Sequence, residues 1–247
     1  MAVRQAKGVV VVGHLMAETS TSSIIIPILN EARHLPRQLA ALQKWRHAGH
    51  EVIVVDGGSN DASIDIARPW VDQVIRSEKG RAVQMNAGAA LAVNNWLVFL
   101  HVDTFFSNTA MNSLQLVLPR KDISWGRFNA RLSGSHPLFT IISRLMNMRS
   151  QLTGIATGDQ VMFVRKCVFK QVGGFPEIAL MEDISLSSHL KKIASPHCVP
   201  DTVTTSSRRW REYGILKTIL MMWSLRLRYF FGENPSVLAE RYGRSSK

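Results

Sequence analysis

Short continuous apolar runs alternate with longer segments over the first hundred positions of the chain, and in these longer segments the apolar residues have helical spacing. The runs at 23–29, 51–56 and 96–100 are rich in Ile, Val and Leu, which is typical of strands buried on both faces of a sheet. Segment 32–47 repeats apolar residues every three or four positions and segment 81–93 is rich in alanine, so both are predicted helices. This alternation predicts an α/β fold whose mainly parallel central sheet is flanked by helices.

The segments between and after these runs carry weaker signals. Ser59 and Asp61 are expected to cap a short helix that Pro69 ends, and a short strand is expected at 74–75. The remaining predicted strands are at 125–128 and 160–164, and a short helix that 173–176 closes is expected after the second of them. Helices are also predicted at 138–150 and 182–193, with a long amphipathic helix at 213–231.

The length of 247 residues suits one sizeable core, so we expect one domain at 23–210. An extension at 1–22 precedes it and an amphipathic helical tail at 211–247 follows it. The longest apolar stretch, 215–227, includes Lys217 and Arg226 and is shorter than a membrane-spanning helix. The expected location is therefore the cytoplasm, either free or peripheral on the cytoplasmic face of the membrane.

The charge of the chain is strongly positive, with a formal net charge of +12. Nine Lys/Arg and three Asp/Glu give the segment 203–247 a net charge of +6, half of the total excess. Such an excess fits a nucleotide diphosphate, an anionic membrane surface or nucleic acid. The apolar face of the tail helix fits either a membrane interface or packing on protein, including a second copy of this chain.

Three acidic residues follow the predicted strands, namely Glu31, Asp56 and Asp103. Ligands of open parallel sheets bind beyond the carboxyl ends of the strands. Asp103 could hold Mg²⁺ or Mn²⁺ together with diphosphate oxygens, and His101 would share its side of the strand. Asp56 precedes two glycines, where a nucleoside can approach the backbone closely. The alternative for each carboxylate is a turn or helix cap.

Two further groups carry candidate chemistry. Glu182 and Asp183 stand at the start of a predicted helix, whose dipole favours an ionised carboxylate able to accept a hydroxyl proton. The basic runs 79–81 and 208–211 supply Lys and Arg that match phosphate oxygens. The alternatives are a helix-capping pair and solvated basic surfaces.

Taken in order, these motifs resemble the family 2 glycosyltransferases over residues 23–210. The motifs are Ile26-Pro27-x-x-Asn30-Glu31, Val55-Asp56-Gly57-Gly58-Ser59-x-Asp61, Lys79-Gly80-Arg81-x-x-Gln84-x-Asn86-x-Gly88, Leu100-His101-x-Asp103, Gly158-Asp159-Gln160, Gly173-Gly174-Phe175-Pro176 and Glu182-Asp183. The Lys-Gly-Arg, Gly-Asp-Gln and Arg-Arg-Trp elements resemble a small bacterial subgroup, the radical-SAM/selenodomain-associated glycosyltransferases.

The resemblance implies the GT-A fold (the nucleotide-diphospho-sugar transferase fold) and a role for each matching residue. Asp183 would be the catalytic base, with Glu182 beside it, and Asp103 would bind the metal. The implied donor-binding residues are Pro27, Asn30, Glu31, Asp56, Gly58, Lys79, Arg81, Asp103, Arg208, Arg209 and Trp210, and the implied acceptor-side residues are Gly158, Asp159 and Gln160. His101 departs from the family pattern, because it replaces the first Asp of the Asp-x-Asp metal motif.

The implied reaction moves a sugar from a nucleotide-diphosphate sugar, with UDP-sugar favoured, to a hydroxyl acceptor with inversion, assisted by Mg²⁺ or Mn²⁺. A lipid-linked acceptor would suit the tail helix. Two other functions stay open, namely a nucleotide-sugar-binding regulatory module without turnover and a basic nucleic-acid binder. The chain has no nucleic-acid-binding motif to support the latter, so nucleic acid is not the expected partner.

Overall fold

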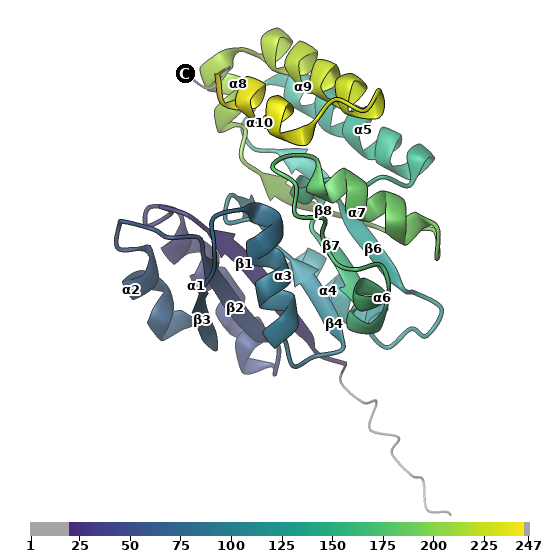
Figure 1. The fold of residues 1–247 in the computed structure, drawn as a ribbon. Helices are drawn as coiled ribbons and strands as arrows, with labels where there is room; N and C mark the ends of the chain where they lie inside the picture. Colours follow the sequence, from purple (N-terminus) through teal and green to yellow (C-terminus); the bar gives the residue numbers. More distant parts are fainter. Residues whose placement is uncertain (1–19, 245–247) are drawn as a thin grey trace, which may run out of the picture.

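One eight-stranded sheet runs through residues 20–244, the part of the chain that the computed structural model describes (Figure 1). Most of the predicted extension, residues 1–19, lies outside the described residues. The strand order is β3-β2-β1-β4-β7-β6-β8-β5. The strands are β1 Ser22–Ile28, β2 Glu51–Asp56, β3 Gln73–Arg76, β4 Trp96–Phe99, β5 Thr104–Phe105, β6 Trp125–Leu132, β7 Met162–Arg165 and β8 His197–Thr205.

The first four strands form the parallel half of the sheet that the sequence predicts. Every residue of β1 and β2 is buried, which explains their unbroken apolar runs. Ile24 and Ile26 face the helices α1 and α4, while Ile25 faces α3. A Cβ on Gly88 of α3 would lie 2.5 Å from Cγ2 of Ile25, so a glycine is required for this close contact between helix and sheet.

The second half of the sheet mixes directions. β7 pairs antiparallel with β4 and β6, β8 runs parallel to β6, and β5 pairs antiparallel with β8. Strand β7 begins two residues later than predicted because 158–160 form a short 3₁₀ turn. Strands β5 and β8 were not predicted. β8 contains Pro200 and Asp201, and the β6–β8 register shifts at Phe128, so the strand has no regular alternation.

Ten α-helices occur among the described residues, and several bounds differ from the prediction. They are α1 Leu35–His47, α2 Ser63–Ala67, α3 Arg81–Leu91, α4 Asn108–Val117, α5 Pro137–Thr153, α6 Lys166–Gln171, α7 Glu182–Lys191, α8 Arg208–Tyr213, α9 Ile215–Phe230 and α10 Pro235–Arg244. The expected cap of α2 by Ser59 is wrong, because the Ser59 hydroxyl accepts the N–H of Asn30. Asp61 accepts the N–H groups of Ser63 and Ala32 instead of capping from the N-cap position.

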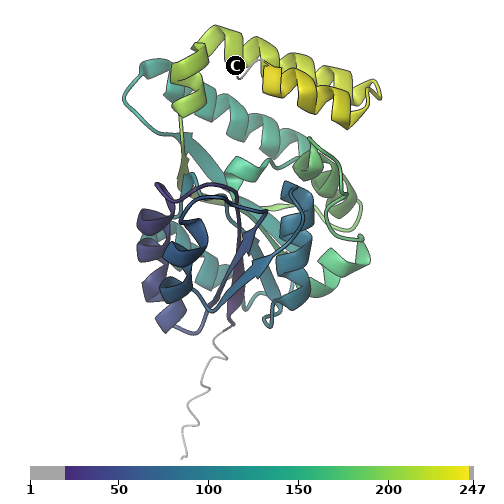
Figure 2. The same cartoon turned by 60° about the vertical axis from the view of Figure 1, so that its left-hand side comes forward.

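The long tail helix expected at 213–231 is present as α9, which begins two residues later and ends one residue earlier than expected, and the short helix α8 before it was not predicted. Gly214 has φ of 83° and ψ of 146°, which ends α8 and turns the chain into α9. With α10, which was not predicted, these helices form a layer over one end of the sheet, next to α5 (Figures 1 and 2). Leu225 of α9 and Leu238 of α10 pack on Met181, just before α7. The tail is therefore joined to the body by its own small apolar core.

Candidate active site

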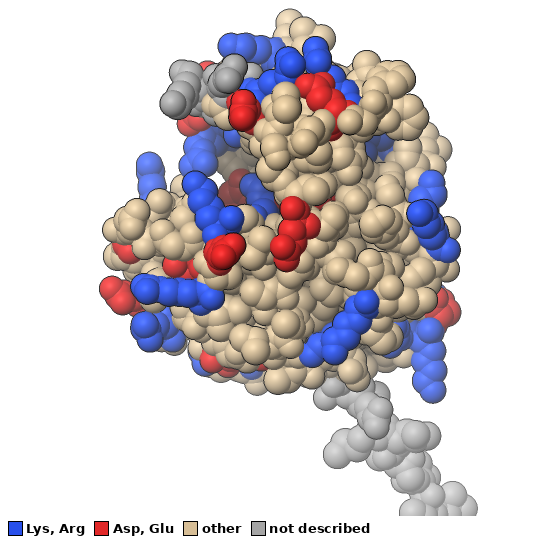
Figure 3. Space-filling view, in the orientation of Figure 1, with Lys and Arg blue, Asp and Glu red and all other residues tan. Residues whose placement is uncertain are grey.

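A cavity of about 630 Å³ lies between the carboxyl ends of β1 and β4 and the helices of the tail. On the face shown in Figure 3 a hollow separates the helical layer from the sheet, with acidic and basic side chains at its edge. The residues lining the cavity are Pro27, Ile28, Leu29, Glu31, Lys79, Gly80, Arg81, Gln84, His101, Val102, Asp103, Ala179, Ser206, Arg208, Arg209, Glu212, Tyr213 and Tyr242.

The three carboxylates at the strand ends have different surroundings. Glu31 and the exposed Asp103 line the cavity. Asp56 is fully buried, and its carboxylate accepts the N–H groups of Gly58 and Ser59 at 3.0 to 3.2 Å. Asp56 therefore shapes the turn after β2 in this structure, and it does not line the cavity.

Two other predicted donor-binding residues support that turn. Asn30 adopts a left-handed conformation, with φ of 55°, and its side-chain oxygen accepts the N–H of Asn60. Gly58 has φ of 95°, a conformation that residues with a side chain rarely adopt. Neither lines the cavity. The hydrogen bond of Asn30 holds the loops after β1 and β2 against each other, and Gly58 permits the turn of the second loop.

His101 lies at the wall of the cavity, pressed against the backbone of Gly158. A Cβ on Gly158 would stand 2.2 Å from Cε1 of the imidazole. Burial, together with the nearby Arg81 cation, lowers the pKa of His101 to about 3. The imidazole is therefore neutral near pH 7.

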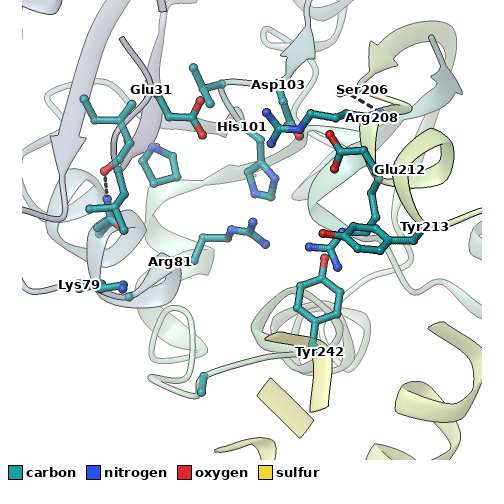
Figure 4. A pocket seen from close by; sticks show the side chains of 18 residues that line it. Glu31, Lys79, Arg81, His101, Asp103, Ser206, Arg208, Glu212, Tyr213 and Tyr242 are labelled. Carbon is teal, nitrogen blue, oxygen red and sulfur yellow. Dashed lines mark hydrogen bonds between the residues drawn. The ribbon is translucent and has the colours of Figure 1, made fainter. Parts of the chain in front are cut away.

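Arg81 stands at the start of α3 and points into the middle of the cavity (Figure 4). Its Nη1 lies 3.9 Å from Oε1 of Glu182. Burial alone would lower the pKa of Arg81, but the negative charges of Glu182, Asp103 and Asp183 outweigh it and raise that pKa. Burial and Asp183 raise the pKa of Glu182, and Arg81 opposes them. One guanidinium thus interacts with three carboxylates.

Asp183 lies at the start of α7, next to the loop that holds Gly158. Its Oδ2 accepts the N–H of Gly158 at 2.8 Å and its Oδ1 accepts the N–H of Ile184 at 2.7 Å. Asp159, in the same loop, has its pKa raised to about 6 by burial and by the charges of Asp103 and Asp183. Neither Asp183 nor Asp159 lines the cavity itself, but both belong to the group of charges around it.

The basic residues after β8 divide between two environments. Arg208 and Arg209 line the cavity, and Arg208 extends toward Asp103 (Figure 4). The Arg209 guanidinium lies 3.9 Å from the centre of the Tyr242 ring. Trp210 points elsewhere and packs on the apolar cluster formed by α5 and β6. In this structure Trp210 supports the tail and does not line the cavity.

The family of the chain follows from a comparison of its sequence. Residues 23–169 match the family described as Glycosyl transferase family 2. The chain belongs to glycosyl transferase family 2. A PGL/p-HBAD biosynthesis glycosyltransferase of Mycobacterium bovis is 38% identical over 88 residues, 33% of this chain and 34% of that protein. An uncharacterized glycosyltransferase of Haemophilus influenzae is 26% identical over 168 residues, 66% of this chain and 54% of that protein.

The chain thus spans about a third to a half of the length of these family 2 relatives. Among solved structures, S. aureus TarS 1–349 in complex with UDP-GlcNAc has a TM-score of 0.61 at 17% identity, covering 76% of this chain and 59% of that one. The mannosyltransferase PcManGT from Pyrobaculum calidifontis, in complex with GDP-Man and Mn²⁺, has a TM-score of 0.58 at 19% identity, covering 83% and 64%. These likenesses confirm the expected GT-A fold.

A divalent metal fits this family 2 site if protein side chains supply only some of its ligands. Among the described residues, no three His, Cys, Asp or Glu side chains converge as a ready-made metal site. Asp103 offers an exposed carboxylate at the cavity wall, beside the neutral imidazole of His101, and Glu212 of α8 offers a second one. Mg²⁺ is commonly held by one or two carboxylates, substrate phosphates and water. The residues present therefore fit a metal that the donor diphosphate helps to bind.

Sequence reasoning missed the part of the wall that comes from the tail. Ser206, Glu212, Tyr213 and Tyr242 all line the cavity, and Tyr242 lies on the unpredicted α10. The signal available in the sequence was Tyr242 itself, an aromatic residue in an amphipathic segment. That pattern does not reveal that α10 folds back toward the cavity. Gln160 has a local role, because its side-chain oxygen accepts the N–H of Thr157 and closes the 3₁₀ turn.

Proposed function

We propose that this protein is a glycosyltransferase that moves a sugar from a nucleotide-diphosphate donor to a hydroxyl acceptor. The observation that carries the proposal is the facing arrangement of Asp103 with Arg81, Arg208 and Arg209 around one cavity in a family 2 chain. Cations around a closed space neutralise the charge that builds on a departing diphosphate. UDP is the favoured nucleotide, supported by the TarS structures in complex with UDP and UDP-GlcNAc.

On the donor side, Pro27 and Glu31 would bind the nucleoside, and the turn held by Asn30, Asp56 and Gly58 would shape its pocket. Lys79, Arg81, Arg208 and Arg209 would bind the phosphates. Trp210 would act by anchoring the segment that carries the two arginines. When bound at Asp103, Mg²⁺ or Mn²⁺ would supply further positive charge to the diphosphate.

In the reaction, Asp183 would accept the proton of the acceptor hydroxyl. The acceptor oxygen would form its bond to the anomeric carbon as the bond from that carbon to the diphosphate oxygen breaks. The bonding electron pair would leave with the nucleoside diphosphate. A single displacement of this kind inverts the anomeric configuration, which NMR of the product can verify. The hydrogen bonds from Gly158 and Ile184 hold the carboxylate of Asp183 in one orientation.

The acceptor would lie on the side of Gly158, Asp159 and Gln160. Arg149 of α5 and Arg226 of α9 interact electrostatically with Asp183 there. Nε and Nη2 of Arg149 are buried and lack a hydrogen-bond partner within the described residues. Buried donors of this kind require oxygen acceptors, which supports an oxygen-rich acceptor. A lipid-linked acceptor is part of the proposal, and the radical-SAM-associated subgroup remains a prediction.

The decisive experiment is a thermal-shift screen of nucleotide sugars with and without Mn²⁺, followed by calorimetry with Asp103→Asn. A ligand that binds only the native state raises Tm. We expect a metal-dependent shift with UDP-sugars that Asp103→Asn abolishes, while the distant, exposed Asp122→Asn leaves it unchanged. Binding that is the same in both variants would contradict the proposal. Binding without transfer or donor hydrolysis would instead identify a regulatory nucleotide-sugar-binding module.

A further inference from the structure

Two neighbouring helices each present a row of large apolar side chains to solvent. On α5 these side chains are between 40 and 79% exposed, and they are Leu138, Ile141, Leu145, Met148 and Leu152. On α9 they are between 59 and 83% exposed, and they are Leu216, Leu220, Trp223, Leu227 and Phe230. Phe231, next to the end of α9, is 77% exposed. We call these eleven residues the α5–α9 surface.

The rows are separate from the faces by which the helices pack. Phe139 and Ile142 of α5 form a cluster with Ile215 and Ile219 of α9. Leu225 faces the core shared with α10. Spacings of three and four keep each exposed row on one side of its helix. Figures 1 and 2 both show α5 and α9 next to each other in the helical layer. Within residues 20–244, these apolar side chains therefore stay exposed although both helices already pack on the protein by their other faces.

The charge around the rows selects the partner. Residues 137–153 and 215–230 contain five Lys or Arg and no Asp or Glu. Two of the five, Arg149 and Arg226, interact with Asp183 on the inner side of the helices. Arg144 and Lys217 are exposed, while Arg228 pairs with Glu233 at 3.0 Å. A symmetric dimer through this surface would bring like charges together, because each patch would meet its own copy. An anionic phospholipid surface instead complements both the charge and the apolar rows.

We propose that the α5–α9 surface binds the interface of an anionic phospholipid bilayer. Trp and Phe side chains favour the level of the lipid head groups, and basic side chains favour anionic head groups. Trp223 and Phe230 occupy the exposed row of α9. Within residues 20–244 no helix is both long and apolar enough to cross a bilayer. The protein would therefore lie on the membrane surface.

The same two helices reach the candidate active site. Arg149 comes from α5 and Arg226 from α9, and both interact electrostatically with Asp183. A bilayer bound to the outer rows would lie on helices whose inner faces border the acceptor side. That arrangement would present a lipid-linked acceptor to Asp183. This last step rests on the proposed function, whereas binding to the bilayer does not.

The test is flotation of the full-length protein with vesicles of phosphatidylcholine alone or with about one third phosphatidylglycerol. We expect binding to the anionic vesicles and much less to the neutral ones. The triple variant Leu220→Gln, Trp223→Gln, Leu227→Gln should weaken that binding at least about tenfold, because three apolar side chains no longer enter the interface. Leu116→Gln replaces a leucine of α4 that is 75% exposed and should change nothing.

Three outcomes would overturn the proposal. The first is failure of the wild-type protein to float with anionic vesicles. The second is an equal loss of binding in Leu116→Gln and in the triple variant. The third is a dimer in light scattering that the triple variant converts to monomer, since a second copy would then cover the surface. Circular dichroism and thermal unfolding of the same variants verify that they are folded, and because neither needs the nucleotide sugar, this test stays separate from that of the proposed activity.

Discussion

The imidazole of His101 packs directly against the backbone of Gly158. A Cβ added to Gly158 would lie 2.2 Å from Cε1 of the ring and 2.7 Å from Nε2, so only a glycine fits there. The N–H of Gly158 also donates to Asp183 at 2.8 Å. His101 is therefore in direct contact with the loop that orients the proposed base. This contact joins the proposed donor side of the site to the proposed acceptor side.

Gly158→Ala should move His101 or the loop and disturb the hydrogen bond to Asp183. We expect kcat/KM for sugar transfer to fall at least about a hundredfold, since misplacement of reacting groups by about 1 Å has an effect of that order. Gly243→Ala is the matched control, because the added methyl group meets nothing within 4 Å. Steady-state kinetics of the two variants test this expectation, and an equal effect in both would contradict it.

Arg81→Gln should weaken donor binding, because it removes a cation that faces the cavity and interacts with three carboxylates. The expected loss is about tenfold or more in the Kd for UDP, as measured by calorimetry. Arg81→Lys keeps the charge and should retain part of the affinity. Arg120→Gln changes an exposed arginine paired with Asp122 and should leave the Kd unaltered. An unchanged Kd for UDP in Arg81→Gln would show that Arg81 does not bind the diphosphate.

Asp183→Asn should separate catalysis from binding. The amide oxygen can still accept the N–H of Gly158, but the side chain can no longer take a proton from the acceptor. We expect kcat to fall by a factor of about 10² to 10⁴ while calorimetric binding of the donor changes little. A substantial residual kcat would show that another group is the base, and the neighbouring Asp159 would be the next variant to make.

His50 should make stability depend on pH. It is 3% exposed, accepts the N–H of Ser22 at 3.1 Å, and burial lowers its pKa to about 4. Between pH 6.5 and 4 the unfolded chain binds a proton that the folded state excludes, so the free energy of unfolding is fully present above pH 6.5 and falls as the pH decreases. The expected loss is on the order of 1 to 3 kcal/mol.

His50→Asn keeps an acceptor for Ser22 and cannot titrate. Urea unfolding at several pH values should therefore show a smaller decline of stability for this variant, although His101 contributes a decline of the same sign. His47→Asn, at an exposed position, should reproduce the wild-type profile. An unchanged profile in His50→Asn would show that folding does not lower the pKa of His50.

The sequence pattern predicted those cavity residues that directly follow a buried strand. Glu31 and Asp103 follow buried strands, and the carboxyl ends of parallel strands meet at one edge of a sheet. The same reasoning placed Asp56 there, but its carboxylate bonds to the adjacent backbone. A short-range hydrogen bond competed with the ligand site, and the sequence pattern is the same for both outcomes.

The sequence by itself determined the parallel half of the sheet, because burial on both faces demands continuous apolar runs such as that of β1. It also determined that the tail would contain an amphipathic helix. Only the tertiary structure decided that Tyr242 lines the cavity and that Arg226 approaches Asp183. Periodicity describes one element at a time, whereas the contacts between distant elements depend on how the whole chain packs.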